Sequence, residues 1–185
     1  MTTTGPRAAA VVLAAALAFA AGCGGSGDKT SSAEQWANGF CEAVTTWQND
    51  LTSIANNLKQ KQSSLTKSDV TSSVDKAKSS TQTLGKSLKD LGKPDTDAGQ
   101  QAQDEVAQLS DSLSKSVETV QKAVDDASGA GVAGVLNAVS VASGTLVTMG
   151  KEVSSTVSQL EQLDAQGEMK QAFQKASSCK TLVGS

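Results

Sequence analysis

Apolar residues recur at alternating steps of three and four positions along most of the chain after residue 32. This spacing places them on one face of an α-helix, whereas a half-buried strand would alternate every two residues. Four such runs predict an all-α fold. The runs are Ala33, Ala37, Phe40, Val44, Trp47, Leu51, Ile54 and Leu58; Val70, Val74, Ala77, Thr81, Leu84, Leu88 and Leu91; Ala102, Val106, Leu109, Leu113, Val117, Val120, Val124 and Ala127; and Val132, Val135, Val139, Ala142, Leu146, Met149, Val153, Val157, Leu160 and Leu163.

Turn signals between the runs indicate how the helices are connected. A capping-box pattern, Ser31-Ser32-Ala33-Glu34, precedes the first run, and Gly92 and Pro94 follow the second. Short turns are expected near 63–65, 94–96 and 129–131. Narrow apolar seams need partner helices, so we predict an up-down-up-down four-helix bundle with a short C-terminal helix over 168–178. The alternative is an extended antiparallel coiled coil.

Residues 1–22 have the composition of a signal peptide. Arg7 is followed by the wholly apolar stretch 8–21. As a helix this stretch would span only about 21 Å, less than the roughly 30 Å of a hydrocarbon core. We therefore expect three regions: a signal peptide at 1–22, a glycine- and serine-rich flexible tether at 23–31, and a helical domain at 32–185.

The end of this segment, Ala20-Ala21-Gly22-Cys23, resembles the lipobox of bacterial lipoproteins. The resemblance implies that Cys23 becomes the mature N-terminus and carries acyl chains, which anchor the protein stably. The expected location is the extracytoplasmic face of the cell membrane, with the membrane as partner through the acyl chains. Ordinary secretion, with cleavage after an Ala-x-Ala-like site, is the alternative.

The two remaining cysteines, Cys41 and Cys179, are predicted to form a disulfide. In an up-down-up-down bundle the fourth helix ends beside the start of the first, so the segment after it returns Cys179 to the neighbourhood of Cys41. With Cys23 acylated, three cysteines leave one pair. The chain has no histidine to activate a thiol or to share a metal. We expect no cofactor and no metal site.

The aromatic residues of the expected mature chain allow three interpretations. Trp36, Phe40 and Trp47 lie on one helical face, and Phe173 should fold back to the same end. The rings form either a plug that closes the base of the bundle, a small apolar pocket, or a contact with lipid headgroups. The opposite end, over 128–134, is rich in glycine and alanine, and Gly144 and Gly150 interrupt the fourth run. These small residues are either a loose turn with tolerated glycines or leave room for a partner.

The lipobox and the Trp36…Phe40-Cys41…Trp47 helix resemble the small, functionally uncharacterised helical lipoproteins of actinobacteria, a resemblance that brings no catalytic residue. The formal net charge is −3 with acids and lysines intermixed, so no nucleic acid is expected as a partner. We predict a non-enzymatic module that binds or scaffolds an envelope protein or polymer through polar helix faces. The alternative is a carrier or sensor of a small apolar ligand held in the bundle, and an enzyme ranks third.

Overall fold

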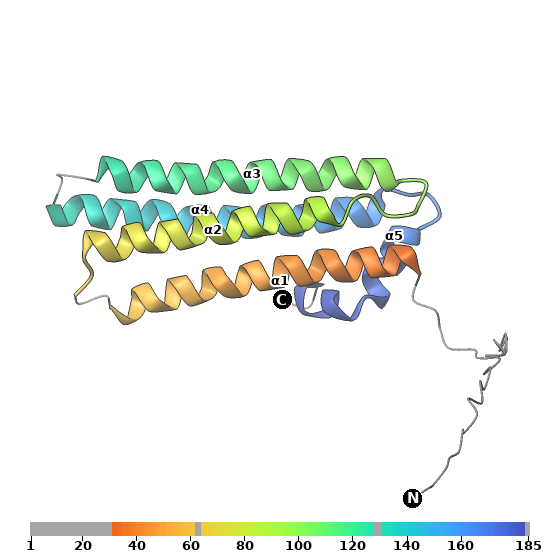
Figure 1. Cartoon of the computed structure of the whole chain (residues 1–185), viewed down its shortest axis with the longest axis horizontal. Helices are drawn as coiled ribbons and strands as arrows, with labels where there is room; N and C mark the ends of the chain where they lie inside the picture. The colour runs from red at the N-terminus through yellow and green to blue at the C-terminus, as the bar shows by residue number, and fades with distance from the viewer. Residues whose placement is uncertain (1–30, 62–63, 128–130, 184–185) are drawn as a thin grey trace, which may run out of the picture.

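The computed structural model describes residues 31–61, 64–127 and 131–183, and within these ranges it is helical without strands. The predicted signal peptide, Cys23 and the predicted tether up to residue 30 lie outside the described residues. The all-α prediction is confirmed. Figure 1 shows four long helices lying side by side, α1 (Ser32–Gln60), α2 (Lys67–Asp90), α3 (Gly99–Asp126) and α4 (Gly131–Gln162). Three short helices follow: α5 (Glu168–Lys175), the 3-10 helix η1 (Ser177–Cys179) and α6 (Lys180–Val183).

Side-chain caps explain where several helices begin. The Ser31 hydroxyl accepts a hydrogen bond from the Glu34 N–H at 3.1 Å, and Thr66 and Asp69 form a reciprocal capping box at the start of α2. Such bonds satisfy amide groups that have no partner inside the helix. The Asp164 carboxylate accepts the N–H groups of Glu168 and Met169, each at 2.8 Å. The turn before α5 is therefore fixed by one side chain.

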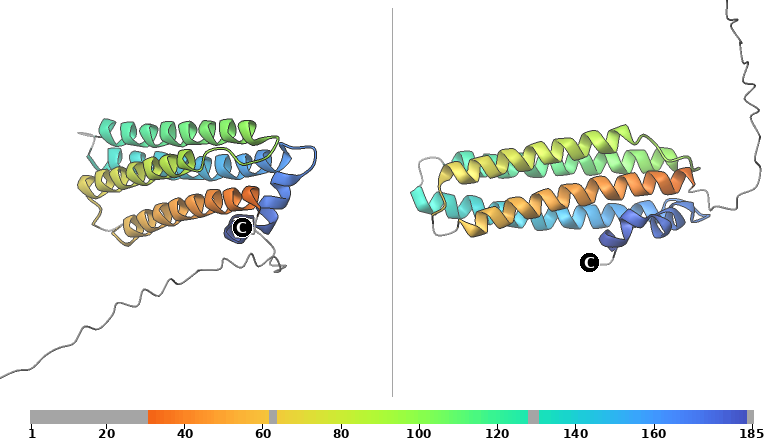
Figure 2. Two further views of the ribbon diagram at one scale, coloured as in Figure 1. Left: turned by 45° about the vertical axis from the view of Figure 1, so that its right-hand side comes forward. Right: turned by 60° about the horizontal axis from the view of Figure 1, so that its bottom comes forward.

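Consecutive helices pack against one another: α1 against α2, α2 against α3, and α3 against α4. Helices α1 and α4 make few direct contacts, and α5 packs against both. Figure 2 shows α5 and the segment after it lying along the first half of α1. The four long helices thus form a bundle whose seam between α1 and α4 is closed at one end by α5.

The predicted apolar faces are buried to different degrees. From Ala33 to Leu51 every residue of the first predicted run is buried, whereas Ile54 and Leu58 are half-buried. In the first half of α4 the predicted core positions with described side chains are only half-buried before Met149. The buried residues form a large cluster that includes Phe40 and Phe173, and a smaller one that consists of Val70, Val74, Val120, Val124 and Ala138.

Candidate functional site

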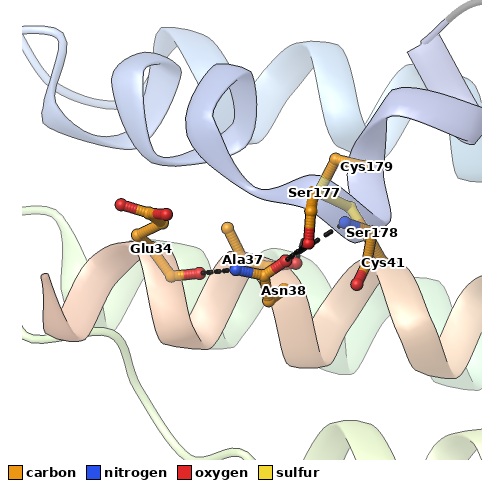
Figure 3. The surroundings of a disulfide bond; sticks show 7 residues. All are labelled: Glu34, Ala37, Asn38, Cys41, Ser177, Ser178 and Cys179. Carbon is orange, nitrogen blue, oxygen red and sulfur yellow. Dashed lines mark hydrogen bonds between the residues drawn. A yellow bond between two sulfur atoms is a disulfide. The ribbon is translucent and has the colours of Figure 1, made fainter. Parts of the chain in front are cut away.

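The end of the bundle at which α5 packs is covalently closed, and we call it the disulfide end. Cys41 and Cys179 form a disulfide with a Cα–Cα distance of 5.0 Å, which confirms the predicted pairing. Figure 3 shows how the segment before Cys179 is held on α1. The Asn38 amide oxygen accepts hydrogen bonds from the Ser178 N–H at 3.1 Å and from the Ser177 hydroxyl at 3.3 Å.

Three of the four predicted aromatic site residues meet beside the disulfide. Trp36 stacks on Phe40 with ring centroids 5.7 Å apart, and Phe173 meets both rings edge-on, at 6.3 Å from Trp36 and 5.8 Å from Phe40. The three side chains are buried, and the Trp36 indole N–H donates to the Gly92 carbonyl at 2.9 Å. Aromatic pairs in these arrangements add to the stability that burial provides. The three rings act as packed core here.

Trp47 lies apart from this cluster, in the middle of α1. Its indole N–H donates a hydrogen bond of 3.0 Å to the hydroxyl of Thr81 on α2, and both side chains are buried. This bond explains why a threonine occupies a core position in the second apolar run, because a buried donor without a partner is costly. Trp47 also borders the groove described below.

A cavity of about 200 Å³ lies between the two core clusters. The lining comes from the second half of α1, the connection to α2, the first half of α2, the second half of α3 and the part of α4 up to Met149, so we call this the cavity end. The lining is mainly aliphatic, and it contains no aromatic side chain. The lining residues are Leu51, Ile54, Ala55, Leu58, Lys59, Leu65, Val70, Ser73, Val74, Ala77, Val117, Val120, Val139, Ala142, Ser143, Thr145, Leu146 and Met149.

The serine hydroxyls of the cavity lining already have partners. Ser73 donates to the Asp69 carbonyl at 2.8 Å, and Ser143 donates to the Val139 carbonyl at 2.9 Å. Both bonds lie within the helix that carries the serine, so these hydroxyl protons are not directed at a ligand. The charged residue in the lining, Lys59, is exposed. The cavity therefore offers an apolar environment.

A groove of about 300 Å³ runs between α1 and α4 next to the cavity. Leu51, Ala55 and Leu146 line both spaces, so the groove and the cavity are adjoining. At Gly150, which also lines the groove, an added Cβ would have no neighbour within 4 Å. Since α1 and α4 make few direct contacts, the groove follows a loosely packed seam of the bundle.

Two ion pairs, Lys61–Asp69 and Lys86–Asp90, lie outside this apolar space and have structural roles. The Lys61 ammonium and the Thr66 hydroxyl bond to the Asp69 carboxylate and hold its pKa well below the ordinary value. Asp90 raises the pKa of Lys86 through an exposed ion pair within α2. No group of three or more histidine, cysteine or acidic side chains suited to a metal ion occurs in the described part of the chain.

Comparison of the chain with protein-family models, curated proteins and solved structures gives no match. The function must therefore be inferred from the site itself.

From the sequence, the four aromatic residues are interpreted as a plug, a small apolar pocket or a contact with lipid headgroups, and the residues that line the cavity are not recognised as a site. The sequence does contain one indication of the cavity: no aromatic residue occurs between Trp47 and Phe173. The helices over that interval supply mainly valine, leucine and alanine to the core, and these side chains fill less volume than rings.

Proposed function

We propose that this protein is a lipid-anchored, extracytoplasmic, non-enzymatic module that holds a small apolar ligand between its helices. The single observation that carries the proposal is the apolar cavity at the cavity end. We also propose that the four long helices run up-down-up-down. The packing of each long helix on the next and the short connections between them support this topology.

The size and chemistry of the cavity support an apolar ligand. An engineered cavity of about 150 Å³ lined by aliphatic and aromatic side chains stays dry and takes up benzene. The present cavity, at about 200 Å³, exceeds that size, and the adjoining groove extends the space available to an elongated molecule. Binding of an apolar molecule here would remove the exposed faces of Leu146 and Ile54 from water, which is favourable.

Two features support an anchored location outside the cytoplasm. The sequence Ala20-Ala21-Gly22-Cys23 has the pattern of a lipobox, and acyl chains on Cys23 would hold the domain at the membrane. The Cys41–Cys179 disulfide is typical of proteins that fold in oxidising compartments.

The cavity favours ligand binding over the sequence-based hypothesis of a scaffold that acts through polar helix faces. A scaffold would need no internal space, and a loosely filled core lowers stability. That hypothesis stays a prediction. A non-enzymatic role is supported by the aliphatic lining, in which a single lysine at the exposed rim is the only titratable side chain.

Binding can be tested with the fluorescent probe N-phenyl-1-naphthylamine and the Cys23→Ser protein, which lacks the acylation site and retains every described residue. We expect saturable binding of one probe per chain. The double variant Ala77→Leu/Ala142→Leu fills the cavity and should weaken binding about tenfold, equivalent to about 1.4 kcal/mol.

The matched control is Ala165→Leu, which makes the same change at an exposed position outside the cavity. It should bind the probe as the Cys23→Ser protein does. Absence of binding, or equal binding by the filled and control variants, would overturn the proposed function.

A further inference from the structure

Helix α4 exposes two large apolar side chains on one face. Leu136 is 65% exposed and Val147 is 60% exposed. They are about three helical turns apart, so both point to the same side of the helix. Ser143 lines the cavity and lies one turn before Val147 on this side of the helix. The exposed apolar face therefore borders the cavity end.

This face also differs from the other helix surfaces in charge. No Asp, Glu, Lys or Arg occurs between residues 131 and 150. The exposed residues on this part of α4 are Gly131, Ala133, Leu136, Asn137, Ser140, Ser143, Gly144, Val147 and Thr148. The exposed surfaces of α1, α2 and α3 carry charged residues such as Glu42, Asp50, Asp75, Lys76, Asp111, Lys115 and Glu118.

Two hydroxyl groups on the uncharged face already donate hydrogen bonds to backbone carbonyls of α4. Ser143 donates to the Val139 carbonyl at 2.9 Å, and Thr148 donates to the Gly144 carbonyl at 3.2 Å. A hydroxyl that already donates a hydrogen bond to the backbone has a smaller free-energy cost of desolvation. The surface can therefore enter an apolar interface at a lower cost than its serine and threonine content implies.

Helix α4 is apolar along much of its length and is partly packed in the protein core. Within the described ranges, Ala133–Gln162 is long and apolar enough to span a membrane by length and composition. However, Met149, Val153 and Leu160 are buried in the protein core, and Glu152 accepts a hydrogen bond of 2.8 Å from Ser112 on α3. From Met149 onward one face of α4 is thus packed in the core, and the opposite face, with Lys151, Ser154 and Ser158, is exposed like the face that carries Leu136 and Val147.

The expected tether keeps this face within reach of a bilayer. The eight residues from 24 to 31 separate Cys23 from the first described helix. Fully extended, they span at most about 28 Å, whereas α4, with 32 residues, is about 48 Å long. A bundle that stood on its disulfide end would hold the cavity far from the bilayer. A bundle that lies on α4 brings the cavity end to the lipid surface.

We propose that the uncharged face of α4 around Leu136 and Val147 is a membrane-contact surface, which presents the groove between α1 and α4 to lipid acyl chains. This inference rests on the proposed function, because the anchor on Cys23 supplies the nearby bilayer. It also names the ligand class, since an acyl chain is the apolar molecule that a bilayer offers.

The test measures quenching of an introduced tryptophan by bilayer lipid. A Cys23→Ser protein that begins at residue 23 with an N-terminal hexahistidine tag is bound to phosphatidylcholine vesicles that contain nickel-chelating lipid. This holds the N-terminus at the bilayer whether or not Cys23 is acylated in the cell. Val147→Trp reports on the proposed surface, and Thr83→Trp, at an exposed position of α2, is the matched control.

With brominated phosphatidylcholine, interfacial insertion of about 5–10 Å should make quenching at position 147 about twofold or more stronger than at position 83. Adding Leu136→Lys should reduce quenching at position 147 to the control value. Equal quenching at positions 147 and 83 would overturn the proposal. A dimer of the vesicle-free protein that Leu136→Lys dissociates would also overturn it, because the face would then bind a second copy of the chain.

The experiment separates this inference from the proposed function. Retained binding of N-phenyl-1-naphthylamine with equal quenching would leave the cavity as a ligand site and remove only the membrane contact. Selective quenching at position 147 together with absent probe binding would support the contact surface and overturn the ligand site.

Discussion

The two ends of the bundle are built from the same four long helices, but the core is filled at one end and contains a cavity at the other. At the disulfide end, Trp36, Phe40 and Phe173 pack together beside a covalent bond. At the cavity end, aliphatic side chains surround a cavity of about 200 Å³, and Leu136 is exposed. The difference teaches that a single periodic pattern can produce a filled core where large rings occur and an open core where they are missing.

The largest expected effect comes from removing the bond that distinguishes the disulfide end. The variant Cys41→Ser/Cys179→Ser should lower the free energy of unfolding by about 4–5 kcal/mol in the chain-entropy model, because the bond closes a loop with a sequence separation of 138. Urea unfolding followed by circular dichroism measures this change. Cys23→Ser, which retains the disulfide, is the control. Equal stability of the two proteins would show that the disulfide does not stabilise the fold.

Matched leucine truncations compare the packing of the two ends. Leu88 is 2% exposed, and Leu88→Ala should lower the free energy of unfolding by about 2–5 kcal/mol. Leu58 is half-buried and lines the cavity, so Leu58→Ala should cost only about 1 kcal/mol. Chemical denaturation of both variants gives the comparison. A greater loss for Leu58→Ala would show that the cavity end is the better packed of the two.

Replacing an alanine by leucine should lower the stability at the disulfide end and raise it at the cavity end. Ala37 is fully buried near the disulfide, so Ala37→Leu should overpack the core and cost about 1–3 kcal/mol. Ala142→Leu extends into existing space and should stabilise the protein by about 0.5–2 kcal/mol. Thermal unfolding should show a lower midpoint for the first variant and a higher midpoint for the second. Destabilisation by both would indicate that the cavity end has no usable space.

A smaller effect concerns the pH dependence of the turn between α1 and α2. Asp69 has a pKa lowered from its ordinary value of 3.8, chiefly by Lys61 and then by Thr66. A lowered native pKa means that the ionised carboxylate stabilises the folded state above pH 3.8, and that this contribution is lost as pH falls through the native pKa. An NMR titration of the Asp69 carboxyl carbon should therefore show a midpoint below 3.8. A midpoint at or above 3.8 would exclude these bonds in solution.

The sequence predicted much of the fold because that information is periodic and local. The apolar face of α1 from Ala33 to Leu51 is the buried one, the Ser31 cap forms, and Gly92, with φ of 64°, follows α2 at the predicted turn. The pairing of Cys41 with Cys179 followed from the predicted topology and is present. These features depend on residue type and spacing, which a sequence contains directly.

The cavity could not be predicted in the same way, because it depends on summed volume across four helices. The pattern marked Val139, Ala142 and Leu146 as core positions, yet all three are half-buried. Whether side chains such as these meet their neighbours depends on the separation of α1 from α4, and α5 packs against both of these helices only at the other end of the bundle. Helical periodicity assigns a residue to a face and contains no information on that separation.

The central claim, that the cavity end holds apolar molecules, is tested most directly by a crystal structure of the Cys23→Ser protein under xenon pressure. Apolar cavities of this size take up xenon. We expect a xenon peak between Leu51, Val74 and Leu146, with no comparable peak among Trp36, Phe40 and Phe173. A cavity end without xenon, or a peak among those three rings in its place, would contradict the account.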